Sequence, residues 1–283
     1  MRRGLSSGKL KWIALVTMLI DHLGAVFGIM PWKWLGLEAT FWTSVPRWIG
    51  RMAFPIFAFL LARGCDKTRS LSRYAGRLAL FALISQIPYT FALGDMNSLR
   101  LTMADSVPLQ LLDLNRLNIF PTLLLGLAAI ACWKKGREHW WWRLGVIPVL
   151  WLSTFGCVSY GIIGVLLIFC LWLFPSGAGT FFTVAAFGVA RQMVAWDQVP
   201  RMVFTSWRVF YGTLKRVLPI LNHPGHITGY MPLLFICLSA VCMLCYDGTR
   251  GRMKKWTAYI FYPAHLLVLG LLRELAIAFH IFS

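Results

Sequence analysis

An Asp-His pair stands in the middle of the first apolar segment of this chain. Asp21 and His22 follow an apolar run that begins at Leu10, and ionisable groups at membrane depth are costly unless they face a partner or a cavity. A histidine near a carboxylate is typical of general-base chemistry; the alternative is a polar pair that only ties helices together. Adjacent helical residues diverge by about 100°, so both side chains cannot point at one spot without a local distortion. We predict that His22 is the base and that Asp21 either orients it or forms a salt bridge.

Two further groups at membrane depth are candidate partners of this pair. Arg51 opens the second apolar segment, where it is either the counter-ion of Asp21 or an interfacial arginine whose charged head reaches water. His265 lies within the last apolar segment, with Tyr262 three residues before it. It is either a hydrogen-bonding strut or a second histidine of a cavity shared with His22.

Other polar residues give weaker signals. Asn118 and Tyr160 lie at the ends of apolar segments, where such groups commonly link helices. His223 and His226 have the spacing of a metal-ligand pair but no third ligand nearby, so we expect a turn there and no metal site. The sequence contains no nucleophile-elbow, phosphate-loop, dinucleotide or HExxH motif.

The composition indicates that lipid is the main solvent. Of the 283 residues, 58% are hydrophobic and 13% are charged, whereas soluble domains carry about a quarter charged residues. The net charge of +18 would suggest nucleic acid in a soluble protein, but the basic residues fill the gaps between apolar segments. We therefore predict a protein of the lipid bilayer that does not bind nucleic acid.

The apolar segments predict an all-α, polytopic integral membrane protein that forms one domain over residues 1–283. We expect about nine transmembrane helices, within a range of eight to ten, and kinks at Pro55 and Pro88. The candidate spans are 10–30, 48–63, 76–93, 117–133, 144–159, 161–175, 180–195, 230–246 and 256–279.

The distribution of Lys and Arg predicts a cytoplasmic N-terminus. Segments 1–11, 63–77, 134–143 and 247–255 hold 17 of the 28 basic residues, and nine spans place all four on one side, as the positive-inside rule requires. Segment 197–229 mixes basic and apolar residues and breaks this pattern. It is an interfacial helix, a re-entrant element or a tenth span.

Several segments, taken in order, resemble the TraX family. They are 10–22, which ends in MLIDH; 50–59, GRMAFPIFAF; 159–166, SYGIIGVL; and 261–266, FYPAHL. Segment 117–120, LNIF, looks like that family's asparagine-bearing helix. The four main matches span the chain from end to end, so together they are specific.

The resemblance implies an inner-membrane acetyltransferase. The TraX family is associated with conjugative plasmids and with N-terminal acetylation of F-type pilin, and it looks related to transmembrane acyltransferases that use cytoplasmic acetyl-CoA. The expected reaction transfers acetyl from acetyl-CoA to the α-amine of a pilin subunit. On this basis His22, Asp21 and His265 are the expected catalytic residues, with His265 on the thioester carbonyl or the acceptor.

The resemblance also implies an acetyl-CoA site. Basic residues of 63–77 and 250–255 would contact the CoA phosphates, or they serve only to set orientation. Asn118 and Tyr160 would contact the developing oxyanion. The residues that we expect at the cosubstrate are Arg51, Asn118, Tyr160 and Tyr262.

Three other functions remain open from the sequence. A non-catalytic pilin chaperone or assembly factor would need no acetyl-CoA. A transporter with a histidine proton relay would show an inverted repeat, and none is evident. An acyltransferase acting on a glycan or a lipid would use the same groups.

Overall fold

The computed structural model describes residues 4–28, 39–94, 116–155, 158–193 and 227–279. Within these ranges the regular secondary structure is helical, and no strand is present apart from one isolated bridge between Leu5 and Tyr246. The predicted all-α class is therefore confirmed for the described part of the chain. Segment 197–226 and the two histidines at 223 and 226 lie outside the described residues.

Within the described ranges, each of the nine predicted spans overlaps at least one helix, and one helix lies largely outside the predicted spans. That helix is α3, which contains Pro46 and Arg47 and so lacks a long apolar run. The predicted span 48–63 is in fact divided between α3 and α4, which meet at a turn at residues 51–52. The α-helices of the described ranges are α1 (Ser7–Phe27), α3 (Ala39–Gly50), α4 (Ala53–Lys67), α5 (Leu71–Leu93), α7 (Ile119–Lys135), α8 (Val146–Ser153), α9 (Gly161–Leu173), α10 (Gly177–Met193), α13 (Ile227–Leu244) and α14 (Thr257–Ala278), with a short 3₁₀ helix at Trp140–Gly145.

Several helices have the length and apolarity that a membrane span requires. Among the described residues, four stretches are long and apolar enough, namely Ser7–Phe27, Ser44–Lys67, Leu71–Leu93 and Thr257–Ala278. Large apolar side chains such as Leu83, Ile147 and Phe182 point outward and are exposed. This architecture is that of a membrane protein, whereas the number of spans and the side of the N-terminus stay predictions.

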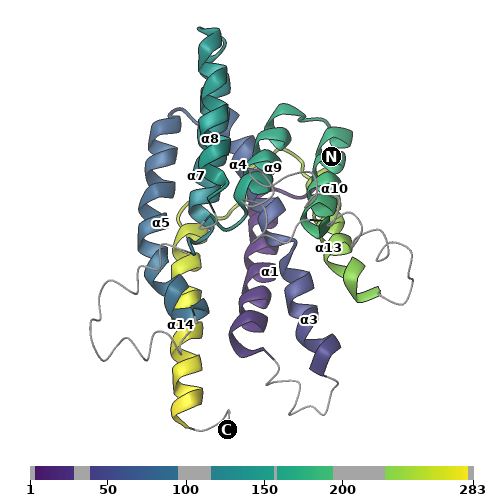
Figure 1. Cartoon of the computed structure of the whole chain (residues 1–283). Coiled ribbons are helices and arrows are strands. Elements are labelled where there is room, and N and C mark those ends of the chain that lie inside the picture. The colour runs from purple at the N-terminus through teal and green to yellow at the C-terminus, as the bar shows by residue number, and fades with distance from the viewer. Residues whose placement is uncertain (1–3, 29–38, 95–115, 156–157, 194–226, 280–283) are drawn as a thin grey trace, which may run out of the picture.

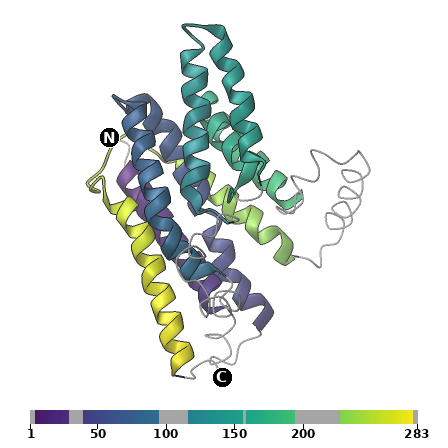
Figure 2. The same cartoon turned by 60° about the vertical axis from the view of Figure 1, so that its left-hand side comes forward.

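The helices pack so that α1 is central to the site. It contacts α3 and α4 on one side and α14 on the other, and α14 lies alongside α5 (Figures 1 and 2). Helices α7, α9 and α4 pack together, and α10 lies against α9 and α13. The pair α7 and α8 extends past the other helices in both views.

Two glycines bring α1 and α3 into close contact. A Cβ added at Gly24 would lie 2.6 Å from Cβ of Pro46, and one added at Gly50 would overlap the side chain of Asp21. Because neither glycine carries a side chain, the polypeptide of α3 can approach α1 directly. This packing places Asp21 against α3.

The two prolines that predicted kinks differ in position. Pro55 is the third residue of α4, so it lies in the first turn, where backbone N–H groups have no partner within the helix. The chain leaves the regular α-helix at residues 51–52, just before α4, so the predicted span 48–63 is interrupted next to Pro55. Pro88 lies inside α5, as predicted.

Candidate active site

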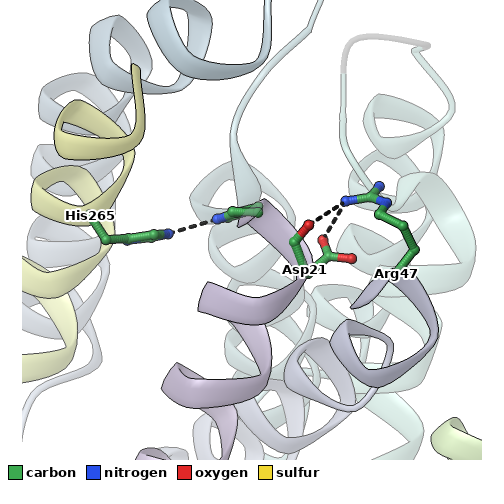
Figure 3. A network of polar contacts seen from close by, with 4 residues as sticks. Asp21, Arg47 and His265 are labelled. Atoms are coloured by element: carbon green, nitrogen blue, oxygen red, sulfur yellow. Dashed lines mark hydrogen bonds and ion pairs between the residues drawn. The ribbon is translucent and has the colours of Figure 1, made fainter. Parts of the chain in front are cut away.

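Two histidines from opposite ends of the chain meet between α1 and α14. Nδ1 of His22 lies 2.7 Å from Nε2 of His265, and the two ring planes are only 9° apart. The exposed fractions of the two residues are 9% and 7%. Figure 3 shows the His265 ring reaching across from α14 toward α1.

The hydrogen bonds assign the tautomers of both rings. Nδ1 of His265 lies 2.7 Å from the carbonyl oxygen of Phe261. A carbonyl oxygen only accepts, so Nδ1–H of His265 must be the donor. In a neutral His265 ring, Nε2 then accepts the Nδ1–H of His22. Nε2 of His22 keeps its lone pair, and no described residue forms a hydrogen bond with it.

Asp21 forms an ion pair with α3. Its Oδ2 lies 2.8 Å from Nη1 of Arg47, and the same nitrogen donates to the backbone oxygen of Asp21 at 3.1 Å. Oδ1 of Asp21 is buried and has no hydrogen-bond partner among the described residues. The expectation that Arg51 is the counter-ion is corrected, because Arg47 makes the direct contact and Arg51 lies farther off, within electrostatic range of the carboxylate.

Asp21 and His22 point toward different helices, as the angle between adjacent helical residues requires. In Figure 3 Asp21 faces Arg47 while His265 approaches from the opposite side. Asp21 therefore does not orient the imidazole of His22. Of the two roles predicted for Asp21, its geometry fits the salt bridge, which it forms with Arg47. The group that orients His22 is His265.

A cavity of about 1020 Å³ connects this region with one end of the helix bundle. Near the histidines its lining includes Asp21, His22, Arg47, Arg51 and Arg191. His22 thus faces open space and is not sealed among apolar side chains. His265 is not part of the lining and reaches the cavity only through its hydrogen bond to His22.

The other end of the cavity is strongly basic. Its lining there includes Lys11, Arg63, Lys67, Arg77, Arg250 and Lys255; we call these six residues the basic mouth. The backbone around it is tied together, since Lys67 donates to the Gly248 carbonyl at 2.8 Å and Ser7 donates to that of Arg250 at 2.7 Å. Among the described lining residues of the whole cavity, Asp21 is the single acid.

The basic mouth and the histidines are well separated along the helices. Lys11 and His22 are eleven residues apart in α1, which corresponds to about 16 Å along the axis. In α10, Thr180 lies 3.5 Å from Arg63 of the mouth, and Arg191 is eleven residues farther on, again about 16 Å. The cavity can therefore hold an extended molecule with an anionic head at the mouth and its other end at His22.

Comparison with known proteins identifies the family. The chain matches the family described as TraX protein over residues 6–273. It belongs to the TraX family. A relative named "Probable fimbrial assembly protein FimC, serogroup H1", from Dichelobacter nodosus, is 29% identical over 271 residues, which cover 93% of this chain and 94% of the relative. No solved structure matches the chain significantly.

Two of the predicted acetyl-CoA-binding residues of this TraX-family protein are aromatic and line the cavity. The ring of Tyr262 stands edge-on to those of His22 and His265, at centroid distances of 6.2 and 5.7 Å. Tyr160 stacks on Phe54 at 3.7 Å between centroids. Both tyrosines are therefore placed to contact a molecule in the cavity.

Asn118 is placed differently from the other predicted residues. It is fully buried and caps α7 by accepting the N–H of Phe120 at 3.0 Å. Its amide nitrogen donates to the Ala82 carbonyl and to Oε1 of Gln86, at 2.7 and 3.0 Å. Asn118 does not line the cavity, so its position explains how α7 begins and gives no support to an oxyanion contact.

The sequence analysis did not single out two arginines of this site. Arg47 falls just outside the predicted span 48–63, and Arg191 follows the apolar part of the predicted span 180–195. Arg191 lies 5.3 Å above the Tyr160 ring and within electrostatic range of Arg51, Asp21 and Arg47. Both arginines could have been noticed in the sequence, because an arginine at the end of an apolar segment either extends its charged group to water or pairs with another residue inside the protein.

Among the described residues, no group of three or more His, Cys, Asp or Glu side chains could hold a metal ion.

Proposed function

We propose that this chain is a multi-pass inner-membrane N-acetyltransferase that acts in pilus assembly. It transfers acetyl from cytoplasmic acetyl-CoA to the N-terminal amine of a pilin subunit. Membership of the TraX family and the name of the Dichelobacter relative support the setting. The observation that carries the chemistry concerns His22. Its Nε2 keeps an available lone pair, and the residue lines a cavity that leads to the basic mouth.

The reaction needs a base beside the thioester. The amine nitrogen attacks the acetyl carbonyl carbon, and Nε2 of His22 takes the proton that the nitrogen loses. The C–N bond forms, the C–S bond breaks, and the proton passes from His22 to the thiolate to give free CoA. Throughout, Nε2 of His265 accepts from Nδ1–H of His22, so the transient imidazolium keeps a partner.

The cavity suits the shape and charge of acetyl-CoA. Arginine and lysine side chains bind phosphate oxygens through charge-assisted hydrogen bonds, and the basic mouth supplies six such groups. The uncharged pantetheine arm would lie along the apolar wall formed by Phe54, Phe57, Leu60 and Leu61. With the phosphates at the mouth, the thioester would lie deep in the bundle near His22.

The proposed topology places the two substrates on opposite sides of the site. Positive segments at the N-terminus and beside the mouth put the mouth in the cytoplasm, where acetyl-CoA is found. The pilin amine would approach His22 from the other side of the membrane. Both substrates then meet within the bilayer without either crossing it.

The test is the intact mass of mature pilin from cells that carry a His22→Ala variant. We expect loss of the acetyl mass increment while the variant stays in the membrane at the normal level. His139→Ala is the matched control, since His139 is exposed and remote from the cavity lining, and it should leave pilin acetylated. Acetylated pilin in the His22→Ala cells would overturn the proposal.

A further inference from the structure

A second hollow lies beside the loop that borders the basic mouth. Its volume is about 580 Å³, and it lies between the start of α1 and the loop that precedes α14. Three of its lining side chains are cationic, and no acidic side chain lines it within the described ranges. We call Lys9, Arg252 and Lys254 the outer cations. All three are exposed.

The loop before α14 divides its basic residues between the two cavities. Arg250 and Lys255 line the cavity that leads to His22. Arg252 and Lys254 line the hollow instead. The loop is held against α1, since the Gly8 amide donates to the Arg250 carbonyl at 3.1 Å. Arg252 and Lys254 are therefore not part of the acetyl-CoA site proposed above.

The charge of the hollow favours an anion. Arg252 and Lys254 form no ion pair with a carboxylate in the part of the chain that the structure describes. Asp247 lies outside the lining of the hollow and within electrostatic range of Lys9. Even when Asp247 balances Lys9 in full, three cations against one acid leave the hollow with a net charge of about +2.

Two rows of exposed apolar side chains lead away from the hollow along the neighbouring helices α1 and α14. On α1, Trp12 and Val16 share one helix face with Lys9, and they are 51% and 50% exposed. On α14, Ile260 lies on the face of Thr257 and is 57% exposed. Trp12 and Thr257 both line the hollow, so both rows begin there. The row on α14 continues with Ala264, Leu267 and Leu271.

We propose that the hollow binds the headgroup of an anionic phospholipid, whose acyl chains lie along the exposed apolar rows of α1 and α14. The outer cations would bind its phosphate oxygens through charge-assisted hydrogen bonds. Trp12 lies between the cations and the apolar rows, and indole rings are typical of the boundary between membrane and water. A soluble anion would leave the rows uncovered, and a lipid without net charge would leave the outer cations unbalanced. An anionic lipid matches both features, and its binding does not depend on the proposed reaction.

The predicted topology agrees with this ligand. Segments 1–11 and 247–255 carry the outer cations, and the positive-inside rule places both in the cytoplasm. Anionic lipids give the cytoplasmic leaflet its negative surface potential, and basic pockets between membrane helices on that side bind their headgroups.

The experiment is native mass spectrometry of the purified full-length protein in detergent. The protein is titrated with phosphatidylglycerol and, separately, with phosphatidylcholine that has the same acyl chains. We expect phosphatidylglycerol to bind with a Kd at least about tenfold lower, because each basic residue near an anionic lipid contributes about fivefold. The double variant R252Q/K254Q should remove this preference.

A second double variant is the matched control. Lys135 and Arg137 are also exposed, and they do not line the hollow. K135Q/R137Q removes the same two types of charge and should keep the preference for phosphatidylglycerol. Since all four side chains are exposed, both double variants should unfold without lipid at the temperature of the wild type.

Photochemical cross-linking locates the acyl chains without any substitution. Phosphatidylglycerol with a diazirine midway along one acyl chain should label α1 and α14 at the exposed apolar rows, near Val16 and Leu267. Labelling confined to other helices would contradict the proposed position of the chains.

Three results of the titrations would overturn the inference. They are an equal Kd for the two lipids, a preference that survives R252Q/K254Q, and displacement of phosphatidylglycerol by an equal concentration of glycerol 3-phosphate. The last result would assign the hollow to a soluble anion. A mass of two chains without bound lipid would assign this face to a second copy of the protein.

Discussion

Replacing His265 by Phe should slow acetyl transfer without removing any group that lines the cavity. The phenyl ring fills a similar volume but offers no nitrogen to accept Nδ1–H of His22, which now donates at 2.7 Å. The N–H would remain buried without an acceptor among the described residues. His22 would then favour the tautomer with hydrogen on Nε2, which cannot act as a base.

The size of the effect follows from the cost of that missing hydrogen bond. Leaving a buried donor without a partner costs about 1–3 kcal/mol. Since about 1.4 kcal/mol corresponds to a factor of ten, the productive tautomer of His22 should fall about 5- to 150-fold. Turnover should fall by the same factor, whereas the KM for acetyl-CoA should change little because the basic mouth is untouched.

A second variant gives the prediction its control. His265→Gln supplies a carbonyl oxygen that can accept from His22, so it should lose less activity than His265→Phe. The assay is acetyl incorporation into a peptide amine by purified, folded variants, with kcat and KM determined separately. Equal turnover of His265→Phe and wild type would refute the tautomer argument, as would equal losses in both folded variants.

Two further changes test the packing and the loop beside the mouth. Gly50→Ala should cost about 1–3 kcal/mol of stability and lower activity, because its Cβ would overlap the Asp21 side chain. Gly76→Ala is the control, since its Cβ would meet nothing within 4 Å. Equal thermal stability of the two variants would contradict the packing argument. Hydrogen bonds from Thr249 hold the pKa of Asp247 below its ordinary value of 3.8. The stabilisation is present above that value and is lost as the pH falls through the lower folded pKa, so hydrogen-exchange protection of the Thr249 amide should decline there in wild type and be low at every pH in Asp247→Ala, which has no side-chain acceptor.

The helical segments were largely predictable because apolarity is a local property. Each predicted span overlaps a helix of the described chain, including short ones such as α8 and α9, although the span 48–63 is divided between α3 and α4. Helix α3 was missed because Pro46 and Arg47 interrupt its apolar residues. Gly24 and Gly50 let it pack closely on α1, and that contact joins residues distant in sequence.

The candidate site was predictable in its chemistry and not in its pairings. His22, Asp21 and His265 stood out because ionisable groups are rare in apolar segments. A cavity shared by His22 and His265 was one of the two interpretations of His265, but nothing local indicated their direct contact across 243 positions. The choice of Arg47 over Arg51 as the counter-ion depended on how α3 approaches α1.

The amino-acid sequence by itself determined that this protein is helical and apolar, that it belongs with the TraX proteins, and that Asp21 and His22 lie within its first apolar segment. These properties depend on the residues within one segment, since the free energies of transferring its side chains to lipid are nearly additive along the chain. Only the tertiary structure decided which nitrogen of His22 is free, which arginine holds Asp21, and that His22 and the basic mouth share one cavity. Those features arise where faces of separate helices meet, and the shapes of the packed side chains select the faces.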